Sequence, residues 1–112
     1  MEADRLVQEV VETIRHDYEP EKIILFGSRA RGDGDRESDL DILIVKESEK
    51  REIERVREVS RLLRRFCGRP YFLPLDILVK TPAEISRRLA MGDDFIRDIM
   101  QHGKVAYERA VV

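Results

Sequence analysis

Three aspartates in or beside apolar runs are the residues of this sequence best suited to chemistry. Asp39 and Asp41 open the run DLDILIV, residues 39–45, which has the composition of a buried strand. Because successive side chains of a strand point to opposite faces, both carboxylates are expected on one face and Leu40 on the other, toward the core. Two neighbouring carboxylates repel each other. A divalent cation such as Mg²⁺, which takes oxygen ligands, removes that repulsion.

Asp76 is the third candidate, because it interrupts the otherwise apolar strand expected at residues 75–79. An unpaired carboxylate buried there costs on the order of several kcal/mol, so it requires a partner or a function. If this strand lies beside the strand at residues 39–45, Asp76 can share a face with Asp39 and Asp41. Three such carboxylates can hold two cations about 3.5–4 Å apart, which clamp the attacking and leaving oxygens of phosphoryl transfer.

A glycine–serine pair follows the first expected strand, KIILF at residues 22–26. Gly27 lets the backbone approach a phosphate closely, and the hydroxyl of Ser28 can donate a hydrogen bond to it. Arg29 and Arg31 can add charge-assisted hydrogen bonds to phosphate oxygens. These four residues are therefore candidates for binding a nucleotide through its phosphates.

Each feature also has a simpler interpretation when it is taken alone. Gly27 and Ser28 fit an ordinary tight turn, Asp39 and Asp41 fit solvated carboxylates at a strand end, and Asp76 fits a carboxylate neutralised by a nearby arginine. Their joint occurrence at these spacings favours an active site.

Hydrophobic periodicity and turn signals predict four helices and four short strands. The helices are expected at 3–17, 48–66, from the Thr81-Pro82-Ala83-Glu84 start onward and at 94–101, and the strands at 22–26, 39–45, 75–79 and 104–108. This order predicts an α/β (α+β) fold with one small mixed sheet and helices packed mainly on one face. The sequence contains no internal repeat and no low-complexity linker, so residues 1–112 are expected to form a single domain.

Composition excludes several other classes of protein. Cys67 is the only cysteine, so neither an internal disulfide nor a cysteine-rich metal site can form. The 6% aromatic content argues against a dedicated binder of single-stranded nucleic acid, so direct nucleic-acid binding is not expected, and Tyr18, Tyr71 and Tyr107 are expected to be packing residues. No apolar run approaches the roughly 18 residues of a membrane span, and no secretory signal is recognisable, so a cytoplasmic protein is expected.

The spacing of these motifs resembles that of a known superfamily. Gly27-Ser28, ten residues, and then Asp39-x-Asp41 are similar to the signature of the DNA polymerase β-like nucleotidyltransferases. The strings GSRARG and SDLDILIV and the tail DDFIRDIMQHGKVAYER resemble its minimal branch, the partners of HEPN-domain proteins. The resemblance covers essentially the whole chain.

The resemblance implies the polymerase β-like nucleotidyltransferase fold and a reaction. A nucleoside monophosphate, AMP from ATP in the expected case, would pass from a nucleoside triphosphate to a hydroxyl with release of pyrophosphate. By position, Asp39 and Asp41 would bind two Mg²⁺ ions, with Mn²⁺ as an alternative, and Asp76 would bind one of them and help to deprotonate the acceptor. Gly27 and Ser28 would hold the β and γ phosphates.

The resemblance also implies a partner, because larger members carry a further domain that shapes the acceptor pocket, and this chain stops about where it would begin. In minimal members paired with HEPN toxins, the implied role is that of an antitoxin that adenylylates a tyrosine of the toxin. Two alternatives remain. One is a non-catalytic module that neutralises a partner by occlusion, and the other is a small-molecule nucleotidyltransferase that forms its acceptor pocket across a homodimer.

Overall fold

A computed structural model describes residues 2–27, 39–66 and 75–110 of the chain. The helices are α1 (Glu2–Tyr18), α3 (Glu52–Leu62), α4 (Pro82–Ala90) and α5 (Asp94–His102), with a short 3₁₀ turn η1 (Arg64–Phe66) after α3. The strands are β1 (Lys22–Phe26), β2 (Leu40–Val45), β3 (Leu75–Lys80) and β4 (Lys104–Glu108). The predicted α/β fold with one small mixed sheet is confirmed, and all four strands lie where the sequence placed them.

The sheet has the strand order β3-β2-β1-β4. β1 runs antiparallel to both β2 and β4, whereas β2 and β3 are parallel. A parallel pair needs a crossover connection, and α3 supplies it between β2 and β3. The β3 strand therefore lies beside β2, which is the condition that brings Asp76 near Asp41.

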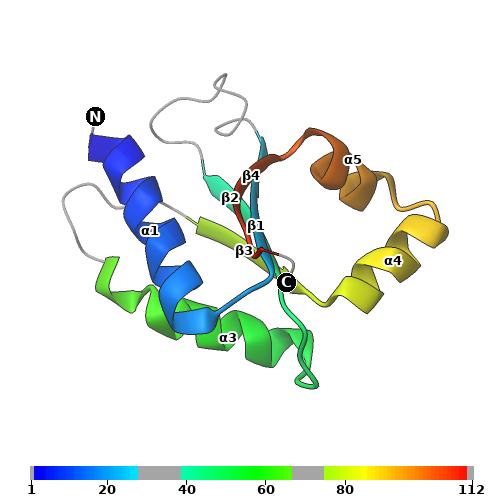
Figure 1. The fold of residues 1–112 in the computed structure, drawn as a ribbon, viewed down its shortest axis with the longest axis horizontal. Helices are drawn as coiled ribbons and strands as arrows, with labels where there is room; N and C mark the ends of the chain where they lie inside the picture. The colour runs from blue at the N-terminus through cyan, green and yellow to red at the C-terminus, as the bar shows by residue number, and fades with distance from the viewer. Residues whose placement is uncertain (1, 28–38, 67–74, 111–112) are drawn as a thin grey trace.

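Helices cover both faces of this sheet (Figure 1). Alternate strand residues point to opposite faces, so Ile42 and Ile44 pack with α1 and α3. Leu43 and Val45 pack on the other side with Ile85 of α4 and the buried residues of α5. The expectation that helices would lie mainly on one face was wrong, because the second face of β1 and β2 is also apolar and needs its own cover.

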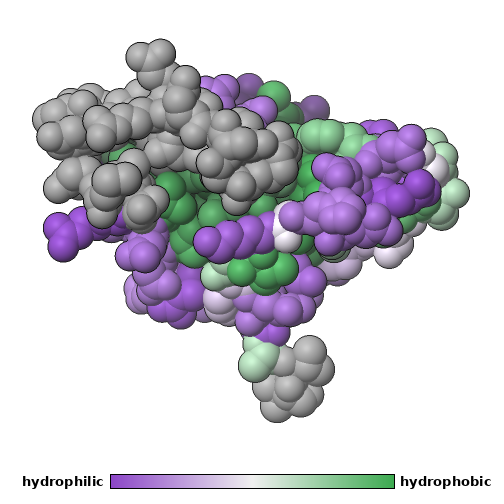
Figure 2. All heavy atoms as spheres, turned by 90° about the horizontal axis from the view of Figure 1, so that it is seen from above, coloured by the Kyte–Doolittle hydropathy of each residue, from purple (hydrophilic) through white to green (hydrophobic). Residues whose placement is uncertain are grey.

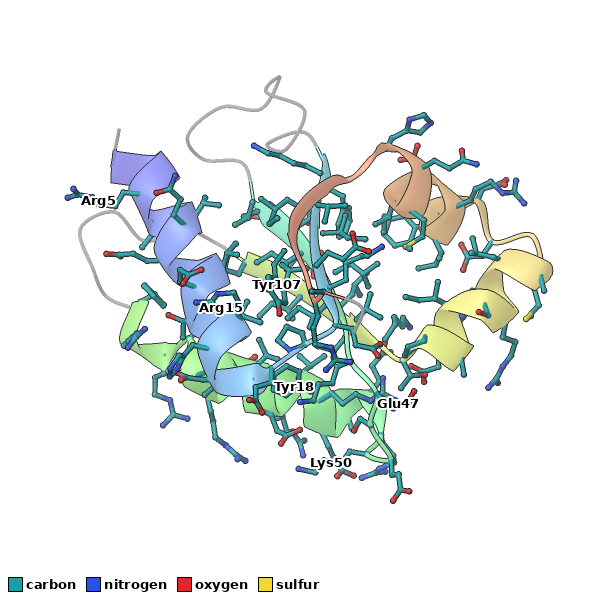
Figure 3. The ribbon with its side chains drawn as sticks, viewed as in Figure 1. Arg5, Arg15, Tyr18, Glu47, Lys50 and Tyr107 are labelled. Carbon is teal, nitrogen blue, oxygen red and sulfur yellow. The ribbon has the colours of Figure 1, made fainter. Side chains whose placement is uncertain are left out.

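Aromatic side chains help to attach α1 to the sheet (Figure 3). The guanidinium carbon of Arg15 lies 6.0 Å from the ring centroid of Tyr107 on β4, and Lys46 Nζ lies 4.6 Å from that of Tyr18. Tyr18 is buried in the core and Tyr107 packs against it. These two tyrosines are packing residues, as predicted, and Tyr71 lies outside the described residues.

Local side-chain hydrogen bonds determine where α4 and α3 begin. Thr81 and Glu84 form a capping box: Glu84 N donates to Thr81 Oγ1 at 3.1 Å, and Thr81 N donates to Glu84 Oε1 at 2.8 Å. The helix expected from residue 48 begins only at Glu52, because Ser48 Oγ accepts the Lys50 amide at 3.0 Å and holds a turn there. No helix in the described part of the chain is both long and apolar enough to cross a membrane.

A buried arginine connects α3 to β3 and α4. Arg55 is 4% exposed, and its Nη1 donates to Val79 O at 2.7 Å and to Glu84 Oε1 at 2.8 Å. Its Nη2 donates to Glu84 Oε2 at 3.1 Å and its Nε to Lys50 O at 2.9 Å. The bidentate pair fixes the start of α4 against α3 at the edge of the sheet, and so determines where the second helical layer begins.

Replacing Gly103 with alanine is expected to destabilise the protein. A Cβ at Gly103 would lie 2.4 Å from Ile24 Cγ2 and 2.5 Å from the backbone oxygen of Ile99, so α5 would have to move off β1. Overpacking of this kind costs about 1–3 kcal/mol. Urea denaturation should show a lower midpoint for Gly103→Ala than for the wild type. An unchanged midpoint would contradict the close packing of α5 on β1.

Candidate active site

The pairing of β2 with β3 brings two aspartates side by side. Asp41 is the register partner of Asp76, and Leu40 is the partner of Leu75. Partners in a parallel ladder point to the same face, and this face also carries Leu43, which packs under α5. Asp41 is half-buried and Asp76 is exposed, so the pair lies at the border between the core and solvent.

Asp39 lies immediately before β2 and is exposed. By the alternation of an extended chain, its position two residues before Asp41 predicts the same side for its side chain. Burial raises the pKa of Asp41, and the negative charges of Asp76 and then Asp39 raise it further. The charges of Asp76 and Asp39 therefore act electrostatically on the Asp41 carboxylate, in addition to its burial.

Gly27 closes the site on the β1 side. Phe26, the last residue of β1, is the register partner of Asp41, so Gly27 follows directly beside that carboxylate. Gly27 has φ +83°, and a Cβ there would lie 2.1 Å from Asp41 Oδ2. Only glycine fits both the backbone conformation and this contact. The other predicted phosphate-binding residues, Ser28, Arg29 and Arg31, lie outside the described residues.

In the described part of the chain, the predicted metal ligands lie on or beside neighbouring strands but do not form a complete metal site. Among residues 2–27, 39–66 and 75–110, no group of three or more histidine, cysteine, aspartate or glutamate side chains has the arrangement that holds a metal ion. Asp41 and Asp76 already lie on adjacent strands, and Asp39 precedes β2 with an exposed side chain. The metal site therefore stays a prediction.

The fold and this edge define a class of protein. The small mixed sheet has a glycine after β1 and carboxylates at the start of β2 and β3. This arrangement suits a transferase that acts on phosphate groups. The chain belongs to the nucleotidyltransferase domain family, whose profile matches residues 7–106. It is a nucleotidyltransferase.

Known proteins from two organisms are similar to this chain. "Putative protein adenylyltransferase MJ0604" of Methanocaldococcus jannaschii is 30% identical over 110 residues, which are 96% of this chain and 100% of the relative. "Putative protein adenylyltransferase MJ0141" of the same organism is 32% identical over 83 residues, 74% of this chain and 75% of the relative. A crystal structure described as a putative nucleotidyltransferase from Sulfolobus solfataricus is 28% identical with a TM-score of 0.62, covering 94% of this chain and 79% of that one.

Gly27→Ala is expected to reduce nucleotidyl transfer by about 100-fold or more, because the new Cβ would displace the Asp41 carboxylate. Gly92→Ala is a matched control: Gly92 has φ +81°, but a Cβ there meets nothing within 4 Å. Both variants should lose about 1–2 kcal/mol from the left-handed backbone, and only Gly27→Ala should lose activity. Equal activity in the two variants would contradict the role of the Gly27–Asp41 contact.

Proposed function

We propose that this protein is a Mg²⁺-dependent adenylyltransferase that transfers AMP from ATP to a hydroxyl group of a partner protein. The observation that supports this most is the register of β2 with β3, which sets Asp76 beside Asp41, two residues after Asp39. The Gly27 backbone lies against the same carboxylate. Gly27, proposed to bind phosphate, thus lies on one side of Asp39 and Asp41. Asp76, proposed to act on the acceptor, lies on the other.

The three carboxylates suit a hard divalent cation. All the donor atoms are carboxylate oxygens, and the pKa of Asp41 is raised first by burial and then by the charges of Asp76 and Asp39, whose repulsion a cation would remove. Asp39, Asp41 and Asp76 are the residues that would hold Mg²⁺, in two sites. When bound, Mg²⁺ supplies positive charge to the phosphate oxygens and neutralises the charge that develops on the leaving pyrophosphate.

The side chains divide the remaining work. Asp76, exposed on the outer strand β3, accepts the proton of the acceptor hydroxyl. The hydroxyl oxygen then bonds to the α phosphorus, the bond from that phosphorus to the β-phosphate oxygen breaks, and pyrophosphate leaves. Gly27 and Ser28 hold the β and γ phosphates, and Arg29 and Arg31 bind phosphate oxygens.

The proposed acceptor is a tyrosine of a HEPN-domain protein, with this chain as the antitoxin. Both relatives from Methanocaldococcus jannaschii carry names that describe a protein adenylyltransferase, which supports a protein acceptor. The resemblance of the tail DDFIRDIMQHGKVAYER to minimal nucleotidyltransferases supports the HEPN partner.

Intact-mass spectrometry tests this proposal. The protein encoded beside this gene is incubated with the purified chain, ATP and Mg²⁺, and it should gain the mass of one AMP per modified hydroxyl. Absence of that gain, together with absence of Mg²⁺-dependent ATP binding, would contradict the proposal. If an Asp39→Asn/Asp41→Asn variant protects cells from the partner as well as the wild type, the chain acts by occlusion instead.

A further inference from the structure

One aromatic ring of α5 is exposed without an evident structural reason. Phe95 of α5 is 57% exposed, and it is the aromatic member of the exposed large apolar side chains in the described part, with Ile53, Met91 and Val105. Its neighbour Ile96 and the later Ile99 are the residues that α5 buries against the sheet. In Figure 2, hydrophobic surface lies beside hydrophilic surface on the side of the molecule that holds α4 and α5. The ring of Phe95 thus adds little to the core.

Phe95 is nevertheless held in place by a second aromatic ring. The ring centroids of Phe95 and Phe26 lie 5.8 Å apart at an interplanar angle of 79°, an edge-to-face contact. In such a contact at least one face of each ring stays uncovered by the other. The large exposed fraction of Phe95 agrees with a ring that is oriented by Phe26 and still presents a face to solvent.

The position of this ring relates it to the catalytic edge. Phe26 is the register partner of Asp41 and precedes Gly27, so Phe95 stands beside the part of the site that would hold the triphosphate. Asp76, the proposed acceptor-side carboxylate, lies on β3, two strands away from β1. Phe95 is therefore on the nucleotide side of the site.

We propose that Phe95 is the platform on which the base of the nucleoside triphosphate stacks, an inference that rests on the proposed function. A heteroaromatic base has a π-face that stacks on an aromatic side chain whatever its hydrogen-bonding groups. A phenylalanine ring offers no donor or acceptor, so the platform retains the base without identifying it. Purine triphosphates should accordingly bind with similar affinity.

The test measures equilibrium binding of α,β-methylene-ATP with Mg²⁺ by calorimetry. Phe95→Leu keeps an apolar contact with Phe26 but removes the π-face, and it should weaken binding by about 5- to 100-fold. Phe95→Tyr should bind like the wild type. Met91→Leu is the control, since Met91 is 71% exposed and lies outside the proposed site. Inorganic triphosphate, which lacks a base, should bind all four proteins equally.

Three results would contradict the proposal that Phe95 stacks on the base. These are an unchanged affinity of Phe95→Leu for the ATP analogue, an equal loss for inorganic triphosphate, and a raised KM for the acceptor protein with ATP binding intact. The last would place the ring in the acceptor interface. A wild-type protein that binds no ATP analogue with Mg²⁺ would instead contradict the proposed function itself.

Discussion

Asp41→Asn is expected to abolish nucleotidyl transfer and at the same time to stabilise the metal-free protein. Loss of this proposed ligand to Mg²⁺ should reduce the rate by at least about 100-fold, since loss of mere supporting groups already costs 10- to 100-fold in other sites. The stability gain has a separate cause. Burial and the charges of Asp76 and Asp39 raise the pKa of Asp41 in the folded state. Its contribution to stability is therefore lost as the pH rises through that folded pKa.

Near neutral pH the ionised Asp41 carboxylate destabilises the fold, and asparagine removes that charge. We expect a gain in the free energy of unfolding without metal, seen as a higher thermal midpoint, within the about 0.5–2 kcal/mol that single charge-optimising substitutions give. Mg²⁺ should raise the midpoint of the wild type and not that of the variant. Glu47→Gln is the control, because Glu47 is an exposed carboxylate just beyond the other end of β2 (Figure 3). A less stable Asp41→Asn protein, or one that keeps its activity, would contradict the proposed site.

Arg55→Met is expected to be the most destabilising single substitution among the charged residues described here. Removing the guanidinium takes one donor from Val79 O and two from the Glu84 carboxylate, which keeps the Thr81 amide, and breaking a buried pair costs about 3–5 kcal/mol. Because the Glu84 side chain is 32% exposed, water can replace part of the loss, and we expect a value near the lower end. Adding Glu84→Gln to Arg55→Met should recover part of it. Urea denaturation of the two single variants and the double variant gives the coupling energy, and additive losses would contradict the pair.

The same pair predicts an acid limit to stability. Hydrogen bonding to Arg55 lowers the pKa of Glu84 from 4.5 to about 2. A carboxyl whose folded pKa is depressed stabilises the fold above its unfolded pKa, and this stabilisation is lost as the pH falls toward the folded value. Wild-type stability should therefore decline between pH 4.5 and about 2 more steeply than that of Arg55→Met. Parallel declines in the two proteins would contradict the link to Glu84.

The strands and the carboxylate edge followed from local sequence. The β-branched runs predict β1, β2 and β3. Asp76 stands out because burying a carboxylate in an apolar strand costs free energy. Alternation put Asp41 and the core residue Ile42 on opposite faces of β2, as the structure has them. Sequence left the neighbour of β2 open, and it is the parallel pairing with β3 that makes Asp76 a partner of Asp41.

Other features depend on contacts that no local pattern contains. Arg55 and Glu84 are separated by 29 positions, and in the sequence Arg55 is one of many basic residues of a charged helix. The stretch Asp94-Phe95-Ile96 does not indicate which apolar residue faces the sheet, so the sequence does not predict the exposure of Phe95. The second helical layer was missed for the same reason, since α4 and α5 are short and their target is a sheet face built from distant strands.

Positional labelling tests the central claim most directly. The chain, Mg²⁺ and the purified partner protein are incubated in parallel with ATP labelled at the α phosphorus and with ATP labelled at the γ phosphorus. Nucleotidyl transfer predicts that only the α label enters the partner, that the γ label leaves as pyrophosphate, and that Asp41→Asn abolishes both. Entry of the γ label into the partner, or release of the γ label as inorganic phosphate alone, would contradict it.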